Sequence, residues 1–351
     1  MTVARHHSIE ARAADRGLRF GRAQAGAVAN TAAVYARIFR EDRGLGPVDI
    51  ARRGRDVDAR IRAFRPALAE EIEGIAAGAG QPADLLFAIN ARTELLAGGA
   101  LAGAAVGECS TIATVDRAHA SGLLVQNWDF HPDLRASRVV WTIDEPGGRR
   151  CTTFTEAGIV AKIGANAHGV ALAINFLASE LDGGLEGVPV HVLCRTVLAE
   201  ARTVQDVRGL VAGTTLSASV CMTVAGPDAE GGVTARAFEL WPGGMAELAP
   251  EPARPWIAHT NHFLAPVAVR DVIAEGGDGA SSRSRMQRLV ATLERMPAPD
   301  AARLTELLCS RGSPGLAPIF RTEDPELPWL RRCATLATVV FEVPGGRMTL
   351  V

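Results

Sequence analysis

The chain has 351 residues, of which 48% are hydrophobic and 22% charged, as in an ordinary globular protein. Its 37 lysines and arginines nearly balance 39 aspartates and glutamates, and the net charge is −2. The chain therefore offers neither a basic surface for nucleic acid nor a polybasic patch for a membrane. The length allows either two domains or one large layered domain.

The cysteines show no C-x-x-C pair and no spacing typical of a metal site, so we expect reduced thiols, no metal and no cofactor. The N-terminal stretch lacks the apolar core of a secretory signal. No run reaches the ~18 apolar residues of a membrane helix. These features predict a cytoplasmic protein. The six cysteines are Cys109, Cys151, Cys194, Cys221, Cys309 and Cys333.

The first hundred residues are predicted to be mostly helical. Apolar residues recur every three or four positions in 9–41 and 56–80, and Asp84 can cap a third helix over 85–98. The glycines near 98–107 then end this helical part.

After residue 109 the apolar period changes to two, which predicts a meander of antiparallel strands. Helices are predicted to alternate with further strands, and a closing hairpin is expected to turn at Gly345-Gly346. This order favours one integrated α+β domain of antiparallel sheets covered by helices. The expected strands are 110–115, 122–130, 138–145, 151–157, 158–166, 169–177, 217–226 and 234–244, and the expected helices are 189–201, 203–213, 281–296 and 300–310.

The residues around Cys109 are the first feature of the sequence that indicates a specific functional site. Cys109 follows the small-residue tract "LLAGGALAGAAVG" and precedes Ser110 and Thr111, and "NWD" ends at Asp129, 20 residues further on. One hairpin can bring Asp129 back beside Cys109. Taken alone, Cys109 could equally be an ordinary buried cysteine.

This order of motifs resembles the penicillin acyltransferase-like family of N-terminal nucleophile hydrolases, which is related to the choloylglycine hydrolases. The resemblance extends to "INARTELL", "GIVAKIGANAHGVALAINFL", "HTNHFLAP" and "SSRSRMQRL". It implies a four-layer αββα fold and self-cleavage of the Glu108–Cys109 bond. Residues 1–108 would then be a helical propeptide or small chain, and 109–351 the hydrolase core, within one integrated domain.

The resemblance also implies roles for individual residues. Cys109 would be the nucleophile, and its new α-amino group, with a pKa of ~7.7–8.0, would act as its base. Asp129 would hold that amino group, Asn261 would donate to the oxyanion, and Arg285 would favour the thiolate. Thr111 and Ser284 would contact substrate.

Several alternatives remain open on the sequence alone. Arg288 lies one helical turn after Arg285 and could face the site instead. His259 and His262 flank Asn261, so a Cys–His pair is conceivable, although the amino-group base does not need one.

Two departures from the family's pattern limit what the resemblance implies. The only tyrosine, Tyr35, precedes the nucleophile, so the active-site tyrosine of penicillin V acylases has no counterpart after it, which argues against penicillin V as substrate. Glu108 stands where the fungal penicillin acyltransferase has glycine, so the processing rate of that enzyme does not carry over.

The expected function is hydrolysis of a linear N-acyl amide or short peptide conjugate through a thioester on Cys109. Acyl transfer from a coenzyme A thioester is the alternative within the family, and an unprocessed, non-catalytic binding protein is the alternative from another class. Small molecules, and neither nucleic acid nor membrane, are the expected partners, with a possible homo-oligomer.

Overall fold

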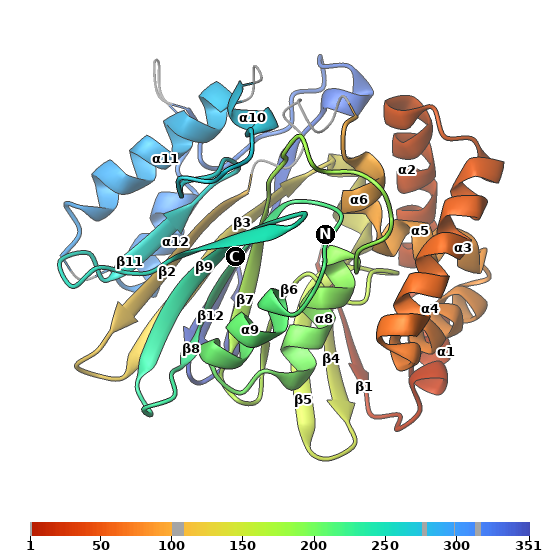
Figure 1. The fold of residues 1–351 in the computed structure, drawn as a ribbon, viewed down its shortest axis with the longest axis horizontal. Helices are drawn as coiled ribbons and strands as arrows, with labels where there is room; N and C mark the ends of the chain where they lie inside the picture. Colours follow the sequence, from red (N-terminus) through yellow and green to blue (C-terminus); the bar gives the residue numbers. More distant parts are fainter. Residues whose placement is uncertain (1, 100–108, 276–278, 298, 313–316) are drawn as a thin grey trace.

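Two β-sheets form the centre of the molecule. The computed structural model describes residues 2–99, 109–275, 279–297, 299–312 and 317–351. In these residues an eight-stranded sheet has the order β1-β4-β5-β6-β7-β8-β9-β10, and a five-stranded sheet has the order β11-β2-β3-β12-β13 (Figure 1). The larger sheet contains β1 (Ala4–Ser8), β4 (Arg138–Glu145), β5 (Arg149–Glu156), β6 (Ile163–Asn166), β7 (Ala171–Phe176), β8 (Val220–Pro227), β9 (Val233–Trp241) and β10 (Gly244–Leu248). The smaller contains β2 (Ser110–Asp116), β3 (Ser121–Phe130), β11 (Trp256–His259), β12 (Ala334–Val343) and β13 (Arg347–Leu350).

Helices cover the outer face of each sheet. Helix α8 packs on β5, β6 and β7, and α9 packs on β8 and β9, whereas α11 contacts β11 and α12 contacts β3 and β12. The sheets face each other through contacts of β2 and β3 with β7, β8 and β9. The predicted four-layer αββα architecture is therefore confirmed. The helices are α1 (Ala13–Ala23), α2 (Ala25–Arg43), α3 (Pro47–Phe64), α4 (Pro66–Ala79), α5 (Ala83–Asn90), α6 (Arg92–Leu96), α8 (Val190–Glu200), α9 (Val204–Ala212), α10 (Val272–Glu275), α11 (Gly279–Leu293) and α12 (Ala301–Leu308).

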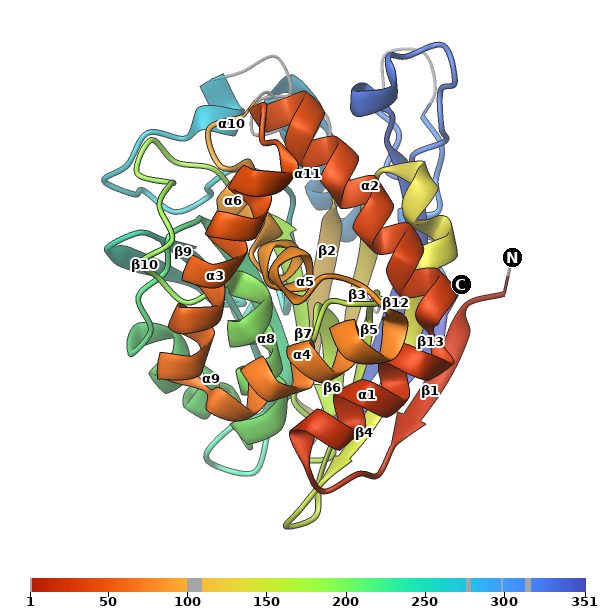
Figure 2. The ribbon, with the colours of Figure 1, turned by 90° about the vertical axis from the view of Figure 1, so that its right-hand side faces the viewer.

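The N-terminal helices gather on one side of the larger sheet, where Figure 2 shows α1 to α5 facing the viewer. Each long helical stretch predicted there is divided into two. One break falls at Arg65, because Pro66 lacks the backbone N–H of a helix interior and its ring clashes with the preceding turn. Helices α1 and α4 pack backbone against backbone: a Cβ at Gly17 or Gly74 would overlap the other helix.

The N-terminal segment also contributes a strand that the sequence analysis did not anticipate. Residues Ala4–Ser8 form β1 and pair in parallel with β4, from Ala4 opposite Val139 to Ser8 opposite Ile143. Ser8 is buried and its hydroxyl accepts a hydrogen bond from Trp141 Nε1 at 2.9 Å. The part of the chain before residue 109 thus completes the larger sheet as well as covering it.

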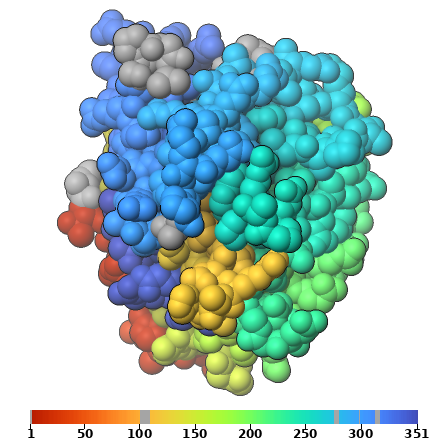
Figure 3. Space-filling view, turned by 90° about the vertical axis from the view of Figure 1, so that its left-hand side faces the viewer, coloured from red at the N-terminus to blue at the C-terminus, as the bar shows by residue number. Residues whose placement is uncertain are grey.

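The hairpin of β2 and β3, which follows Cys109, lies inside this assembly. In Figure 3 the turn of the β2–β3 hairpin, in gold, reaches the surface between the blue C-terminal helices and the teal strands. The other end of the hairpin, at Cys109 and Asp129, is buried. Among the described helices, none combines the length and apolar character that a membrane span requires.

Candidate active site

The β2–β3 hairpin places Cys109 beside Asp129. Ser110 pairs with Asn127 in the antiparallel register, so the residue before β2 lies next to the end of β3. The thiol of Cys109 donates to the backbone carbonyl of Asp129 at 3.9 Å, and the two residues are 7% and 0% exposed. The 20-residue separation in sequence therefore becomes direct contact.

Arg285 joins this pair from α11. One guanidinium nitrogen donates to the carbonyl oxygen of Cys109 at 2.8 Å and to Ser110 Oγ at 2.9 Å. The side chain is fully buried. Arg288 instead donates to the carbonyl of Ala317 at 2.9 Å. Of the two arginines that the sequence left open, Arg285 is the one at the cysteine.

Asn261 follows β11 and completes a cluster of residues that are distant in sequence. Its Oδ1 accepts from Arg285 at 3.1 Å, and its backbone N–H donates to Ser282 Oγ at 2.9 Å. Its amide nitrogen donates to the carbonyl of Phe176 at 3.0 Å. Because an amide NH₂ carries two hydrogens, one hydrogen remains for an oxyanion. We call Cys109, Asp129, Asn261 and Arg285 the nucleophile cluster.

His259, the last residue of β11, lies two residues before Asn261 and adjoins this cluster. Its Nε2 lies 2.9 Å from Glu239 Oε1 and its Nδ1 lies 2.8 Å from the carbonyl oxygen of Thr260. Since both partners are acceptors, both ring nitrogens donate and the ring is an imidazolium. Burial alone would lower the pKa of His259, but Cys221 and Glu239 raise it to about 10. A cation hydrogen-bonded to Glu239 is not placed as a base for Cys109.

The remaining predicted residues lie around this cluster. Thr111 is buried and its hydroxyl donates to Asn175 Oδ1 at 2.7 Å, while Ser284 is half-buried on α11. Neither belongs to the described lining of the cavity at Cys109. Glu108 lies outside the described residues.

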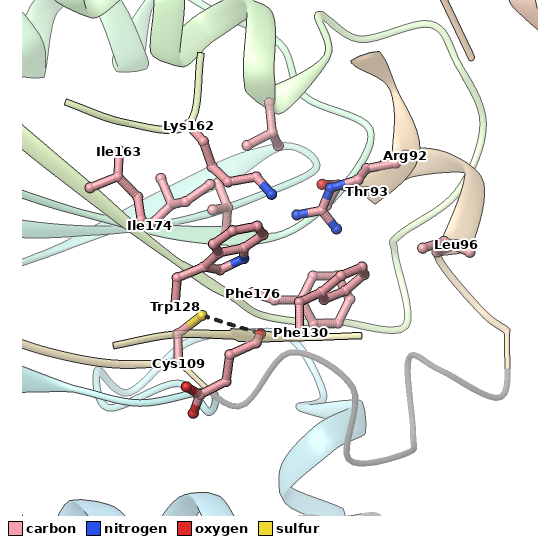
Figure 4. Close-up of a pocket in the computed structure, with 13 residues that line it drawn as sticks. Arg92, Thr93, Leu96, Cys109, Trp128, Phe130, Lys162, Ile163, Ile174 and Phe176 are labelled. Carbon is pink, nitrogen blue, oxygen red and sulfur yellow. Dashed lines mark hydrogen bonds between the residues drawn. The ribbon is translucent and has the colours of Figure 1, made fainter. Parts of the chain in front are cut away.

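A cavity of about 40 Å³ opens beside the thiol (Figure 4). At roughly 10–15 Å³ per water, it has room for a few water molecules in this uncut chain. Its walls are mostly apolar, with cationic and hydroxyl side chains among them. The lining residues are Arg92, Thr93, Leu96, Cys109, Trp128, Asp129, Phe130, Lys162, Ile163, Ile174, Phe176, Val190 and Val220.

Arg92 and Lys162 are cavity residues to which the sequence analysis assigned no role. Both lie within stretches quoted for the family resemblance, and the usable signal was a lysine inside the apolar strand-like run 158–166. Lys162 is 1% exposed and forms an ion pair with Glu156. Burial, and secondarily the charge of Arg92, lowers the pKa of Lys162 to about 7.

The thiol itself is in its neutral form in the uncut chain. Burial, followed by the negative charge of Asp129, raises the pKa of Cys109 to about 12, although Lys162 and Arg285 act in the opposite direction. A nucleophilic thiolate therefore needs a base that accepts its proton.

Comparison with known proteins places this chain in a family. The sequence model described as acyl-coenzyme A:6-aminopenicillanic acid acyl-transferase matches residues 116–351, which include Asp129, Asn261 and Arg285. Cys109 lies just before the matched range. The acyl-coenzyme A:6-aminopenicillanic-acid-acyltransferase 40 kDa form of Emericella nidulans is 30% identical over 211 residues.

These similarities cover the two proteins unequally. The aligned residues make up 60% of this chain and 56% of the Emericella protein, so the chain matches little more than half of that relative's length. The structure of penicillin V acylase from Agrobacterium tumefaciens aligns with 66% of this chain and 79% of its own, at 12% identity. Its TM-score of 0.37 is too low to carry an argument. The family match spans well over half of the chain, and the chain therefore belongs to the acyl-coenzyme A:6-aminopenicillanic acid acyltransferase family.

Proposed function

We propose that this chain is a self-processing cysteine amidohydrolase that acts on a linear N-acyl amide or short peptide conjugate. The observation that carries the proposal is the meeting of Cys109, Asp129, Asn261 and Arg285 at one buried point beside a cavity. These four residues come from the position just before β2, from β3, from the segment after β11, and from α11. Their contact supports a built site rather than an ordinary buried cysteine.

The first step is cleavage of the chain's own Glu108–Cys109 bond. The Cys109 sulfur attacks the carbonyl carbon of Glu108, the carbon–nitrogen bond breaks, and the thiol proton ends on the released nitrogen. Water then hydrolyses the resulting thioester, which frees the carboxylate of residue 108 and restores the thiol. The product carries an α-amino group on the nucleophile itself.

The new α-amino group supplies the base that the uncut chain lacks. It accepts the thiol proton, and the buried carboxylate of Asp129 next to Cys109 holds the resulting ammonium. The sulfur then attacks the substrate carbonyl, and the amide N–H of Asn261 stabilises the oxyanion. The leaving amine takes the proton, and water hydrolyses the acyl-enzyme. Arg285, bonded to the carbonyl of Cys109, fixes the nucleophile's backbone.

The two pieces of the chain should remain one integrated domain after cleavage. Residues 1–108 supply β1 to the larger sheet, and Phe20 stacks on Trp141 with ring centroids 4.1 Å apart. Tyr35 stacks on Phe130 at 6.0 Å. Separation would expose this shared core to water.

The alternative reaction is acyl transfer from an acyl-coenzyme A thioester to an amine. It is favoured by the names of the matching family and of the Emericella relative. Both reactions pass through the same thioester on Cys109 and differ in whether water or an amine resolves it.

Electrophoresis of freshly purified protein, with N-terminal sequencing of the larger fragment, tests the proposal. Two chains, the larger beginning at Cys109, are expected. A panel of amides and thioesters, with and without an amine acceptor, then separates hydrolysis from transfer. A chain that stays intact and turns over neither class would be a binding protein instead.

A further inference from the structure

One end of the cavity concentrates positive charge. Figure 4 shows the Arg92 guanidinium and the Lys162 ammonium pointing toward each other, with Cys109 at the opposite end and aromatic side chains between. Arg92 comes from α6, before the cleavage point, and Lys162 immediately precedes β6. We call Arg92, Lys162, Glu156 and Tyr35 the cation cluster.

The charge of Lys162 is matched within the protein. Its ammonium pairs with Glu156 Oε2 and lies 4.2 Å from the centre of the Trp128 ring. The other oxygen of Glu156 accepts from the Tyr35 hydroxyl at 2.7 Å. Both oxygens of Glu156 thus already have hydrogen-bonding partners, although its charge also acts on Arg92.

Arg92 feels the charge of Glu156, but no carboxylate among the described residues is hydrogen-bonded to its guanidinium. Its guanidinium lies over the rings of Phe130 and Tyr35, at 4.7 and 5.7 Å from their centres. Its Nε is buried and meets no acceptor there. The nearest carboxyl on the same helix, Glu94, accepts instead from the backbone N–H of Val190 at 2.8 Å.

The cavity therefore contains a guanidinium whose buried Nε–H has no hydrogen-bond acceptor among the described residues. A guanidinium presents parallel N–H groups that match the two oxygens of a carboxylate. The apolar walls between it and Cys109, formed by Trp128, Phe130 and Phe176, suit a short methylene chain. At this end of the cavity Lys162 is buried and Arg92 is half-buried, which suits an acyl group that enters and stays on sulfur rather than an amine that must leave.

We propose that the substrate's acyl group is that of a linear dicarboxylic acid, whose distal carboxylate pairs with Arg92 while its other carbonyl lies at Cys109. This inference rests on the proposed function and adds the acyl class to it. Lys162 adds positive potential at the same point, and Thr93 lies beside Arg92 in the cavity lining.

The test compares substrates that differ only in charge. Processed wild-type protein is given the 4-nitroanilides of succinic, glutaric and adipic acid, and the same anilides with the free carboxylate replaced by a carboxamide. We expect at least one acid to exceed its carboxamide by roughly 10- to 100-fold in kcat/KM, the range for a hydrogen bond to a charged group. Equal turnover at all three lengths overturns the inference but leaves the proposed function standing. No turnover of any of these anilides also overturns the inference, and the proposed function is then decided separately by cleavage at Cys109 and by the wider panel of amides and thioesters.

Substitutions of Arg92 test whether this side chain causes the preference for the acid over the carboxamide. Arg92→Met should abolish it while retaining cleavage of the carboxamide, and Arg92→Lys should restore part of it. Arg37 provides a matched control, because its guanidinium also stacks on an aromatic ring, 3.7 Å from the centre of Trp329, but outside the cavity. Arg37→Met should keep the preference. If Arg92→Met lowers kcat/KM equally for the acid and the carboxamide, Arg92 is only a packing residue and the inference is wrong.

Discussion

The nucleophile cluster and the cation cluster each contribute two side chains to one cavity, Cys109 and Asp129 from the first and Arg92 and Lys162 from the second, but they are built differently. All members of the nucleophile cluster lie at or after residue 109, and Arg285 bonds directly to Cys109 and Asn261. The cation cluster takes Arg92 and Tyr35 from before the proposed cut and Glu156 and Lys162 from after it. The chemistry would thus belong to the larger piece, whereas substrate selection would need both pieces.

Removal of the Cys109 thiol should have the largest effect, because it should stop both self-cleavage and turnover. Cys109→Ala is expected to remain a single chain and to lose all activity, because one sulfur serves both cleavage and turnover. Denaturing electrophoresis and an amide-cleavage assay check both outcomes. Cys109→Ser, which keeps a weaker nucleophile, should process slowly if at all. A Cys109→Ala protein that is still cut or still active would remove the nucleophile cluster from the mechanism.

The oxyanion donor should come next. Asn261→Ala is expected to lower kcat by about 10²–10³-fold in processed protein, because one donor to the developing oxyanion is lost. Asn175→Ala is a useful control, because this buried asparagine accepts from Thr111 and donates to the carbonyl of His259, whereas Asn261 bonds to Arg285. Single-turnover kinetics on purified, cleaved variants make the measurement. An unchanged kcat in Asn261→Ala would show that another group binds the oxyanion.

Substitution of Lys162 tests the ion pair with Glu156 in the cation cluster. In the uncut Cys109→Ala background, Lys162→Met should reduce the free energy of unfolding by about 3–5 kcal/mol, because Glu156 is left buried without its cation. Adding Glu156→Gln should recover part of the loss. Urea denaturation of the single, double and parent proteins supplies the values. A loss below about 1 kcal/mol would mean that the pair is not formed.

The two clusters also differed in how far the sequence could predict them. Cys109, Asp129, Asn261 and Arg285 stand in local motifs, so a family resemblance could propose all four, and the period-two pattern predicted the hairpin that joins the first two. The structure alone shows that Arg285 rather than Arg288 faces inward. The family and the αββα layers were predicted correctly.

The cation cluster depends on tertiary contacts that no local pattern records. Tyr35 meets Glu156 across 121 residues, and only the fold shows that Arg92 enters the same cavity as Lys162. Strand β1 was missed for a similar reason, because a five-residue strand is specified by its partner β4 more than by its own sequence. Features that depend on local sequence were therefore predicted, whereas features that depend on contacts between distant residues were not.

The last effect concerns the imidazolium of His259 next to the nucleophile cluster and appears in the pH dependence of stability rather than in turnover. The pKa of His259 rises from its ordinary value of 6.5 to about 10 on folding, so between these values the folded protein holds a proton that the unfolded chain has released. The stabilisation from this group is complete below pH 6.5 and is lost as pH rises toward 10. In the Cys109→Ala background, His259→Gln should flatten the decline in unfolding free energy between pH 7 and 10.

His262 provides the matched control for that measurement. Burial, and then the charge of His259, lowers the pKa of His262 to about 4, so this ring is neutral above pH 7 in both folded and unfolded states. His262→Gln can reduce stability, because its ring bonds to Ser282 Oγ at 2.7 Å, but it should leave the slope between pH 7 and 10 unchanged. Direct observation of the His259 ring by NMR gives an independent reading. If that ring titrates near pH 6.5, the charged hydrogen-bond network to Glu239 is absent.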